Sequence, residues 1–226
     1  MMDVLTAIEG RQSIRAFDAS RAVADDLIRQ ILTVAARAPS GSNIQPWQVW
    51  VVKGDLKERI SHACEARFLG GDEGQGKYHY YPQNWRQPYL GRRRETGFGL
   101  YGLLGIDRKD NEAVTAYRVR NYRFFDAPVG LFFTIDRDME LGSWLDYGMF
   151  LQSIMLSARG LGLETCPQAA FCPYYDSIMP LLGAPEEQML VCGMALGYAV
   201  ADAPVNGYRT SRLEAVEFTH FLAPDH

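Results

Sequence analysis

Residues 128–135 have the sequence PVGLFFTI, and this stretch decides the fold class of the chain. An uncharged run rich in aromatic and branched side chains predicts a β-strand that is covered on both faces. The next long apolar segment, residues 142–159, carries charges only at Asp146 and Arg159. A helix that is apolar nearly all round is buried in a core or at a subunit interface. The buried strand and the buried helix together predict an α+β domain.

Further helices and strands are predicted on both sides of this pair. In residues 24–37 apolar side chains recur on one face, acidic residues stand in the first turn, and Pro39 follows the last turn. No repeat and no linker divides the chain, so a single domain over residues 1–226 is expected. The predicted helices are residues 3–10, 24–37, 55–69, 91–105, 109–123 and 174–182, and the other predicted strands are residues 47–52, 163–169 and 189–198.

The composition of the chain is typical of a soluble globular protein, with 226 residues of which 47% are hydrophobic and 22% charged. Its 12 Tyr, 11 Phe and 4 Trp exclude disorder as the main state, because disordered chains contain few aromatic residues. The net charge of −4 argues against a general nucleic-acid binder. No apolar run approaches the roughly 18 residues that cross a bilayer, and residues 1–4 carry no secretion signal. A cytoplasmic protein without membrane contact is therefore expected.

Several well-known site patterns are excluded. The four cysteines form no C-x-x-C pair and are expected to be free thiols, and the scattered histidines predict no metal site. Residues 97–102, GFGLYG, match the dinucleotide pattern G-x-G-x-x-G, which requires a buried strand directly before it. Residues 91–96 are GRRRET, which no buried strand would contain, so the match is interpreted as chance.

One polar motif follows the first predicted helix. Arg11-Gln12-Ser13-Ile14-Arg15 places two guanidinium groups four residues apart, with a hydroxyl between them. Such a group of donors suits a phosphate or another anion. The alternative is a pair of cations that stabilise a helix C-terminus, and this motif alone does not decide between the two.

A second polar motif lies at residues 38–47, APSGSNIQPW, between a helix end and a predicted strand. Ser40, Ser42, Asn43 and Gln45 give this short connection a polar density that suits hydrogen bonding to a ligand. The alternative is an ordinary turn in which Asn satisfies its own backbone.

Taken together, the two motifs resemble the FMN-dependent nitroreductase family. Residues 162–171, GLETCPQAAF, look like the family's third flavin segment, and the ending Gly197-Tyr198 with Pro204, Asn206 and Arg212 is similar to its C-terminal signature. The resemblance thus spans nearly all 226 residues. Residues 144–171 look most like the bacterial branch that acts on nitrobenzenes and nitrobenzoates.

The resemblance implies an α+β sandwich with a mostly antiparallel sheet, built as an intertwined homodimer with two FMN sites in the subunit interface. The helix over residues 142–159 would form the dimer core, and residues 199–226 would reach the partner subunit. One subunit would supply Arg11, Gln12, Ser13 and Arg15 to each FMN, and the other subunit Pro39, Ser40, Gly41, Asn43 and Gln45. The remaining implied FMN residues are Pro167, Gln168, Ala169, Ala170 and Arg212.

The resemblance also implies roles for individual residues. Arg11 and Arg212 would neutralise the FMN phosphate, and Arg15 would face the N1/C2-carbonyl edge of the flavin. The backbone N–H of Ala170 would reach flavin N5. Family members often have an acidic residue just before that position, where this chain has Ala169.

The implied activity is reduction of nitroaromatics to hydroxylamines by a ping-pong mechanism, with NAD(P)H as the hydride donor. Residues 70–125 could form a substrate lid, because residues 86–123 carry a local charge of +5 and aromatic residues such as Trp85 and Tyr89 cluster before and within them. The alternative for this segment is a set of exposed helices with solvated arginines.

Other functions stay open at this point. The same scaffold could reduce quinones or enones, or dehalogenate phenols. A non-catalytic flavin-binding protein and an Arg-rich interaction module are the alternatives outside enzymes. The sequence does not choose between NADH and NADPH, and it does not identify the physiological acceptor.

Overall fold

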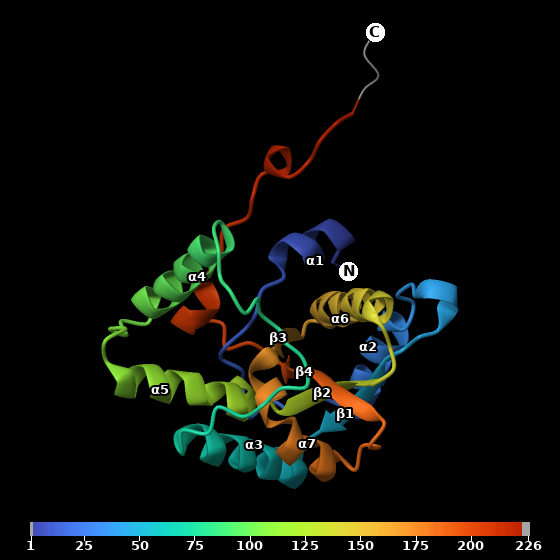
Figure 1. Ribbon diagram of the computed structural model, residues 1–226, viewed down its shortest axis with the longest axis horizontal. Coiled ribbons are helices and arrows are strands. Elements are labelled where there is room, and N and C mark those ends of the chain that lie inside the picture. The colour runs from blue at the N-terminus through green and yellow to red at the C-terminus, as the bar shows by residue number, and fades with distance from the viewer. Residues whose placement is uncertain (1, 223–226) are drawn as a thin grey trace.

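The computed structural model describes residues 2–222, and its centre is a four-stranded antiparallel sheet (Figure 1). The strand order is β1-β2-β4-β3, so the two longest strands lie in the middle. The strands are β1 (Gln48–Val52), β2 (Val129–Asp136), β3 (Glu164–Gln168) and β4 (Gln188–Gly197).

Strand β2 fulfils the expectation for PVGLFFTI, because every residue from Val129 to Ile135 is buried. Its side chains alternate between two hydrophobic clusters, with Leu131 and Phe133 in one and Phe132 in the other. Gly130 allows close packing on this strand, since a Cβ there would lie 2.5 Å from the Phe124 ring. The strand is therefore covered on both faces, as predicted.

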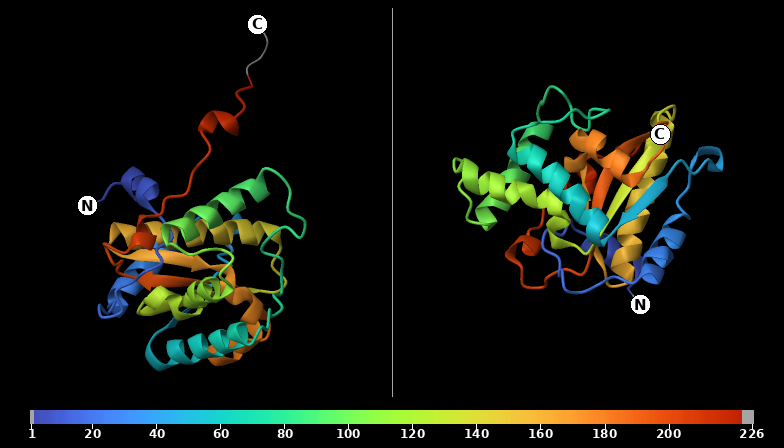
Figure 2. Two further views of the ribbon diagram at one scale, coloured as in Figure 1. Left: turned by 90° about the vertical axis from the view of Figure 1, so that its left-hand side faces the viewer. Right: turned by 90° about the horizontal axis from the view of Figure 1, so that it is seen from below.

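Helices cover both faces of the sheet (Figure 2). On one face, α2 (Asp25–Ala35) and α6 (Leu141–Gly160) pack against Leu131 and Phe133. On the other face, α3 (Gly54–Leu69), α7 (Tyr175–Leu182) and the turn η3 (Ala169–Tyr174) pack around Phe132. This three-layer arrangement confirms the predicted α+β class.

The predicted elements agree with the structure to within two residues at each end, apart from the helix expected over residues 109–123. There α5 (Asn111–Val119) ends early, and the chain continues in the 3₁₀ segment η2 (Arg120–Asp126). Phe124 and Phe125 have positive φ, of 53° and 54°, and both are buried. Successive side chains of an α-helix point about 100° apart, so a regular helix would not bury both rings in one cluster. Tertiary packing overrides the local preference here.

Helix α4 (Tyr89–Leu103) lies at the edge of the molecule and has no buried residue. It contains the GFGLYG match inside the helix, with no strand before it, so that pattern is no dinucleotide loop. The segment between α3 and α4 crosses the molecule and carries the aromatic residues 78–89 (Figure 2).

The two ends of the chain meet at the edge strand β3. After α1 (Val4–Gly10), Ser13 bridges Thr165 of β3, and Phe17 bridges Ala199 just after β4. After the short turn η4 (Pro204–Gly207) the chain extends away from the body of the molecule, and the turn η5 (Ala215–Glu217) lies within this protruding segment (Figure 1). Its last described residues, 221–222, have exposed side chains.

The four cysteines are free thiols, as predicted, and all are buried. Burial raises the pKa of Cys166 to about 11 and that of Cys64 to about 12, so these thiols stay protonated. Among residues 2–222, no helix is both long and apolar enough to cross a membrane. The same part of the chain contains no group of three or more His, Cys, Asp or Glu side chains arranged to hold a metal ion.

Candidate functional site

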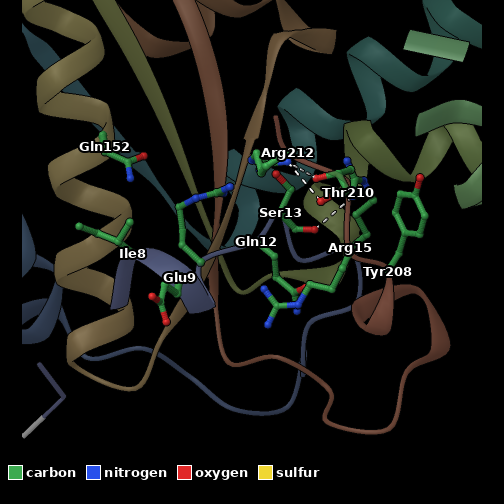
Figure 3. A pocket seen from close by; sticks show the side chains of 11 residues that line it. Ile8, Glu9, Gln12, Ser13, Arg15, Gln152, Tyr208, Thr210 and Arg212 are labelled. Atoms are coloured by element: carbon green, nitrogen blue, oxygen red, sulfur yellow. Dashed lines mark hydrogen bonds between the residues drawn. The ribbon is translucent and has the colours of Figure 1, made fainter. Parts of the chain in front are cut away.

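A cavity of about 610 Å³ opens where the two chain ends meet helix α6 (Figure 3). Its walls come from α1, from the segment after it, from the middle of α6 and from the C-terminal segment. In Figure 3, Gln152 of α6 and Tyr208 of the C-terminal segment stand on opposite sides of it. The cavity is lined by Ile8, Glu9, Arg11, Gln12, Ser13, Arg15, Gln152, Tyr208, Arg209, Thr210 and Arg212.

This cavity is strongly positive, since four arginines line it against the one carboxylate of Glu9. Burial lowers the pKa of the Arg11 guanidinium, and the like charge of nearby Arg212 lowers it further. Like charges gathered in a half-enclosed space are stabilised by an anion between them. The cavity is therefore suited to a ligand with one or two negative charges.

The N-terminal wall is held by backbone bonds to strand β3. The N–H of Ile14 donates to the carbonyl of Thr165 at 3.1 Å, and the Arg15 guanidinium donates to the carbonyl of Ser13 at 3.2 Å. Behind this wall, Arg159 of α6 forms a largely buried ion pair with Glu164 of β3. These contacts fix the 11–15 segment at the edge of the sheet.

The C-terminal wall uses its own arginines as anchors. Arg209 donates to the carbonyl of Gly10 at 3.2 Å, which ties this wall to the end of α1. The Arg212 guanidinium donates to the hydroxyl of Thr210 at 2.6 Å and to the carbonyl of Ser211 at 2.7 Å. Both guanidinium groups are thereby held beside the cavity with other N–H groups left for a ligand.

A second cavity, of about 230 Å³, lies farther along α6. Its character is aromatic: the rings of Tyr78 and Trp144 are 4.7 Å apart, and the Tyr78 hydroxyl donates to the carbonyl of Val191. Burial raises the pKa of Tyr78, so this phenol stays neutral. The lining residues are Tyr78, Tyr80, Trp144, Tyr147, Gly148, Leu151, Pro167, Gln168, Ala169, Val191 and Cys192.

The two cavities follow the same helix. Gln152 lines the first cavity, while Leu151, Gly148 and Trp144 line the second. Gln152 and Trp144 are eight residue steps apart on the helix, which is about 12 Å at 1.5 Å per residue. A ligand with an anionic end and a flat aromatic end at that separation matches the pair of cavities.

Two buried side-chain oxygens near the cavities have no hydrogen-bond partner among the described residues. Gln12 lines the first cavity and its Oε1 is unpaired, although its Nε2 donates to the carbonyl of Asn206 at 2.7 Å. Gln168 lines the second cavity and its Oε1 is unpaired, while its Nε2 donates to the carbonyl of Asn121 at 2.6 Å. Buried polar atoms are nearly always paired, so both oxygens indicate a missing donor such as a ligand hydroxyl or amide.

The structure brings most of the predicted FMN residues to these two cavities. The first contains Arg11, Gln12, Ser13, Arg15 and Arg212, and the second contains Pro167, Gln168 and Ala169. Ala170 follows directly in η3 and is half-buried.

The predicted residues Pro39, Ser40, Gly41, Asn43 and Gln45 lie elsewhere, in and around the turn η1 (Gly41–Asn43), and line neither cavity of their own chain. This turn is fixed to the first part of α6, because the N–H of Gly41 donates to the carboxylate of Asp146 at 3.0 Å. Ser42, Asn43 and Gln45 have positive φ, of 49°, 59° and 49°. Three such non-glycine residues in one turn cost energy, and such conformations cluster at ligand-binding sites.

The predicted substrate residues Trp85 and Tyr89 also lie outside both cavities. The Arg93 guanidinium stands 4.5 Å from the Trp85 ring, and Arg86 stands 4.9 Å from the Tyr89 ring. Several residues that line the cavities could not be predicted from the sequence. Of these, Tyr78 and Tyr80 belong to the aromatic cluster that the sequence shows, and Gln152 is an isolated amide in an otherwise apolar helix. The other unassigned lining residues with polar or aromatic side chains include Trp144, Tyr147, Tyr208, Arg209 and Thr210.

Comparison with known proteins gives a consistent result. Residues 8–198 match the model of the nitroreductase family. The chain is 40% identical to a chloronitrobenzene nitroreductase of Comamonas testosteroni, over 95% of each chain. It is 39% identical to a 4-nitrobenzoate reductase of Pseudomonas putida, over 99% of this chain and 97% of that one.

A solved structure agrees with these relatives. The FMN- and NADPH-dependent nitroreductase NfnB from Sphigopyxis sp. strain HMH superimposes with a TM-score of 0.95 at 38% identity, covering 98% of this chain and all of that one. The agreement in sequence extends over nearly the whole length, and the fold is shared. The chain described here belongs to the nitroreductase family.

Proposed function

We propose that this protein is an FMN-dependent NAD(P)H oxidoreductase that reduces nitroaromatics of the nitrobenzene or nitrobenzoate type to hydroxylamines. The observation that carries the proposal is the pair of cavities along α6, one lined by four arginines and the other by aromatic rings. Relatives at about 40% identity are reductases of chloronitrobenzene and 4-nitrobenzoate, which supports the same class of acceptor. NfnB uses FMN and NADPH, which supports the same cofactor and donor.

The residues present fit FMN. Arg11 and Arg212 would hold the dianionic phosphate by charge-assisted hydrogen bonds, and Arg15 would face the N1/C2-carbonyl edge of the ring. The unpaired Oε1 of Gln12 is an acceptor that a ribityl hydroxyl would satisfy. Pro167, Gln168 and Ala169 would lie against the flavin ring, with the backbone N–H of Ala170 directed at N5.

Bound FMN supplies the two-electron hydride exchange between NAD(P)H and the acceptor. The chain contributes charge, orientation and exclusion of water. The fixed cation of Arg15 stabilises negative charge beside it, which favours the reduced cofactor. Aromatic walls such as Tyr78 and Trp144 hold a flat ring by stacking. Ala169 has no titratable group, so this position delivers no proton.

We further propose that residues 70–125 act as a substrate lid within the single domain of residues 1–226. A row of neighbouring rings leads from the second cavity toward α4. The ring centroids of Tyr78 and Tyr80 are 6.5 Å apart, and those of Tyr81 and Trp85 are 5.6 Å apart. Arginines stand over the outer rings, as Arg93 does over Trp85. Such a surface stacks an aromatic acceptor and attracts its carboxylate.

A homodimer is proposed as the working form, with residues 199–226 reaching the partner subunit. Two apolar surfaces in the described chain support it. On α6, Leu141 is 84% and Leu145 is 70% exposed, and in the C-terminal segment Phe221 is 94% exposed. Exposed apolar surface of this kind marks an interface. The turn carrying Asn43 would then complete the FMN site of the partner, which accounts for its distance from the cavities of its own chain.

A cytoplasmic location is proposed from the chemistry of the cysteines and of the donor. All four cysteines are free thiols, as in a reducing compartment. NAD(P)H is available as a reductant inside the cell, where the proposed reaction requires it.

The central test is a spectrum of the purified protein. A yellow preparation containing FMN is expected, which anaerobic NADPH bleaches and 4-nitrobenzoate restores. One such cycle delivers two electrons and gives the nitroso compound, so with excess NADPH a second cycle should give the hydroxylamine. Benzoate is the matched control without a nitro group and should restore nothing. A colourless protein that takes up no FMN would contradict the proposal. Recovery of colour with a quinone but not with nitroarenes would move the activity to quinone reduction.

Arg11→Ala is expected to weaken FMN binding by roughly tenfold to a hundredfold, because a hydrogen bond to a charged group contributes about 1.5–3 kcal/mol. Titration of the apoprotein with FMN, followed by flavin fluorescence, measures the change. Arg94→Ala removes the same charge from an exposed site on α4 and should leave the affinity unchanged. Equal effects of the two variants would mean that only overall charge matters.

Trp85→Ala is expected to raise the KM for 4-nitrobenzoate by roughly two- to tenfold, since an aromatic pair contributes about 0.5–1.5 kcal/mol. FMN affinity should stay unchanged, because Trp85 lies outside both cavities. Trp85→Phe keeps a ring and should retain most of the affinity for the acceptor. An unaltered KM in Trp85→Ala would remove the lid from the proposal.

Leu145→Arg is expected to convert the dimer into a monomer, because it places a charge in the centre of the exposed apolar face of α6. Sedimentation velocity measures the oligomeric state, and FMN content should fall with dissociation. Leu69→Arg, on an exposed leucine of α3 behind the sheet, is the control and should remain dimeric. A wild-type protein that sediments as a monomer would contradict the proposed dimer.

A further inference from the structure

Asn206 is a buried polar residue in η4, and every hydrogen-bonding position of its side chain is used. It is 8% exposed. Its Oδ1 accepts from the backbone N–H of Arg15 at 2.9 Å and from that of Ala16 at 3.1 Å. Its Nδ2 donates to the carbonyl of Ala16 at 2.8 Å and to that of Val200 at 3.0 Å. One amide thus joins the N-terminal segment to the chain that follows β4.

The main chain of Asn206 adds a further contact. Its carbonyl accepts from the Gln12 side chain at 2.7 Å, which orients Gln12 and leaves its Oε1 as the unpaired acceptor in the first cavity. The N–H of Val200 donates to the carbonyl of Ala16 at 3.0 Å, so the same region is also joined by backbone alone. Residues 12–16 are therefore held over their whole length from this one side.

Asn206 also determines where the C-terminal arginines begin. Tyr208 and Arg209 follow it after Gly207, and both line the first cavity together with Arg212. Asn206 itself does not line the cavity. Its hydrogen bonds instead set the spacing between the two arginines of the N-terminal wall and those of the C-terminal wall.

Neither of the closest replacements can do this. An aspartate could accept from the two N–H groups, but its carboxylate would face the carbonyls of Ala16 and Val200 without a proton to donate. It would also add a negative charge behind the arginines. An apolar side chain would leave the N–H groups of Arg15 and Ala16 without a partner, at a high cost in stability. The carbonyls of Ala16 and Val200 would keep only their backbone donors.

We propose that Asn206 is a positioning residue for recognition of a phosphate monoester, acting through the spacing of Arg11 from Arg209 and Arg212 rather than by contact with the ligand. The inference rests on the proposed function in taking the phosphate of FMN as that ligand. Riboflavin has the same ring and ribityl chain without the phosphate. Asn206 is therefore expected to govern the preference of the protein for FMN over riboflavin.

The test compares Asn206→Ala and Asn206→Ser with the wild type in titrations of the apoprotein with FMN and with riboflavin. Asn206→Ala should weaken FMN binding by about tenfold or more, and riboflavin binding by about threefold or less, so the preference for FMN falls. Asn206→Ser keeps one donor and one acceptor, so its preference for FMN should lie between that of the wild type and that of Asn206→Ala. It also serves if the alanine variant does not fold. Gln30→Ala, which removes an exposed amide on α2, is the matched control and should behave as the wild type.

A merely structural role predicts a different result. General destabilisation of the protein would weaken the binding of FMN and of riboflavin by the same factor. An unchanged preference for FMN in both variants therefore overturns the inference.

A second measurement separates this inference from the proposed function. Inorganic phosphate should raise the Tm of the wild-type apoprotein more than chloride does at equal ionic strength, and Asn206→Ala should lose that difference. If phosphate stabilises the wild type but not Asn206→Ala, and the wild type binds no FMN in the titration, the role of Asn206 is supported and FMN is rejected as the ligand. Equal stabilisation of the wild type and Asn206→Ala by phosphate would reject the role of Asn206.

Discussion

The candidate site depends on one constraint: arginines from opposite ends of the chain are held together although they repel each other. Arg11 and Arg212 are separated by most of the sequence, yet they line one cavity, and the charge of Arg212 lowers the pKa of Arg11. Their proximity comes from uncharged contacts, namely the bridges of Ser13 to Thr165 and of Phe17 to Ala199. The folded frame thus stores an electrostatic cost that a bound anion relieves. This is preorganisation, because the donors do not have to be assembled when the ligand arrives.

Most of the frame could be predicted from the sequence, because its signals are strong and local. PVGLFFTI lies on a strand buried on both faces, and the apolar helix over residues 142–159 is α6. The prediction failed at residues 120–123, which belong to η2 instead of α5, and directly after them Phe124 and Phe125 adopt positive φ. No local pattern announces that conformation in two consecutive aromatic residues. It arises from the space in the core that both rings fill, and this space exists only once the sheet has formed.

The site was predictable in part, and the division has a physical reason. The family resemblance is confirmed, and it named Arg11, Arg15 and Arg212, which the structure brings together. It did not identify Gln152 or Trp144, because an isolated residue in an apolar helix gives no sign of which way it faces. That direction is set by the packing of α6 on β2. The resemblance named Asn206, but its contacts could not be predicted, since three of its four side-chain hydrogen bonds go to backbone atoms about 190 positions away.

The surroundings of helix α6 explain why its sequence is apolar nearly all round. One side packs Phe150 and Ile154 into the core under the sheet. A second side passes along both cavities, and here Gly148 lacks a side chain where a flat ligand would lie. Leu141 and Leu145 lie on the same side as Gly148, nearer the N-terminal end of the helix, and are exposed in the single chain. A helix with apolar demands on both of its sides has no polar face left to give it amphipathic periodicity. The absence of that periodicity, which obscures the site in the sequence, is itself a consequence of core, cofactor and proposed partner sharing a single helix.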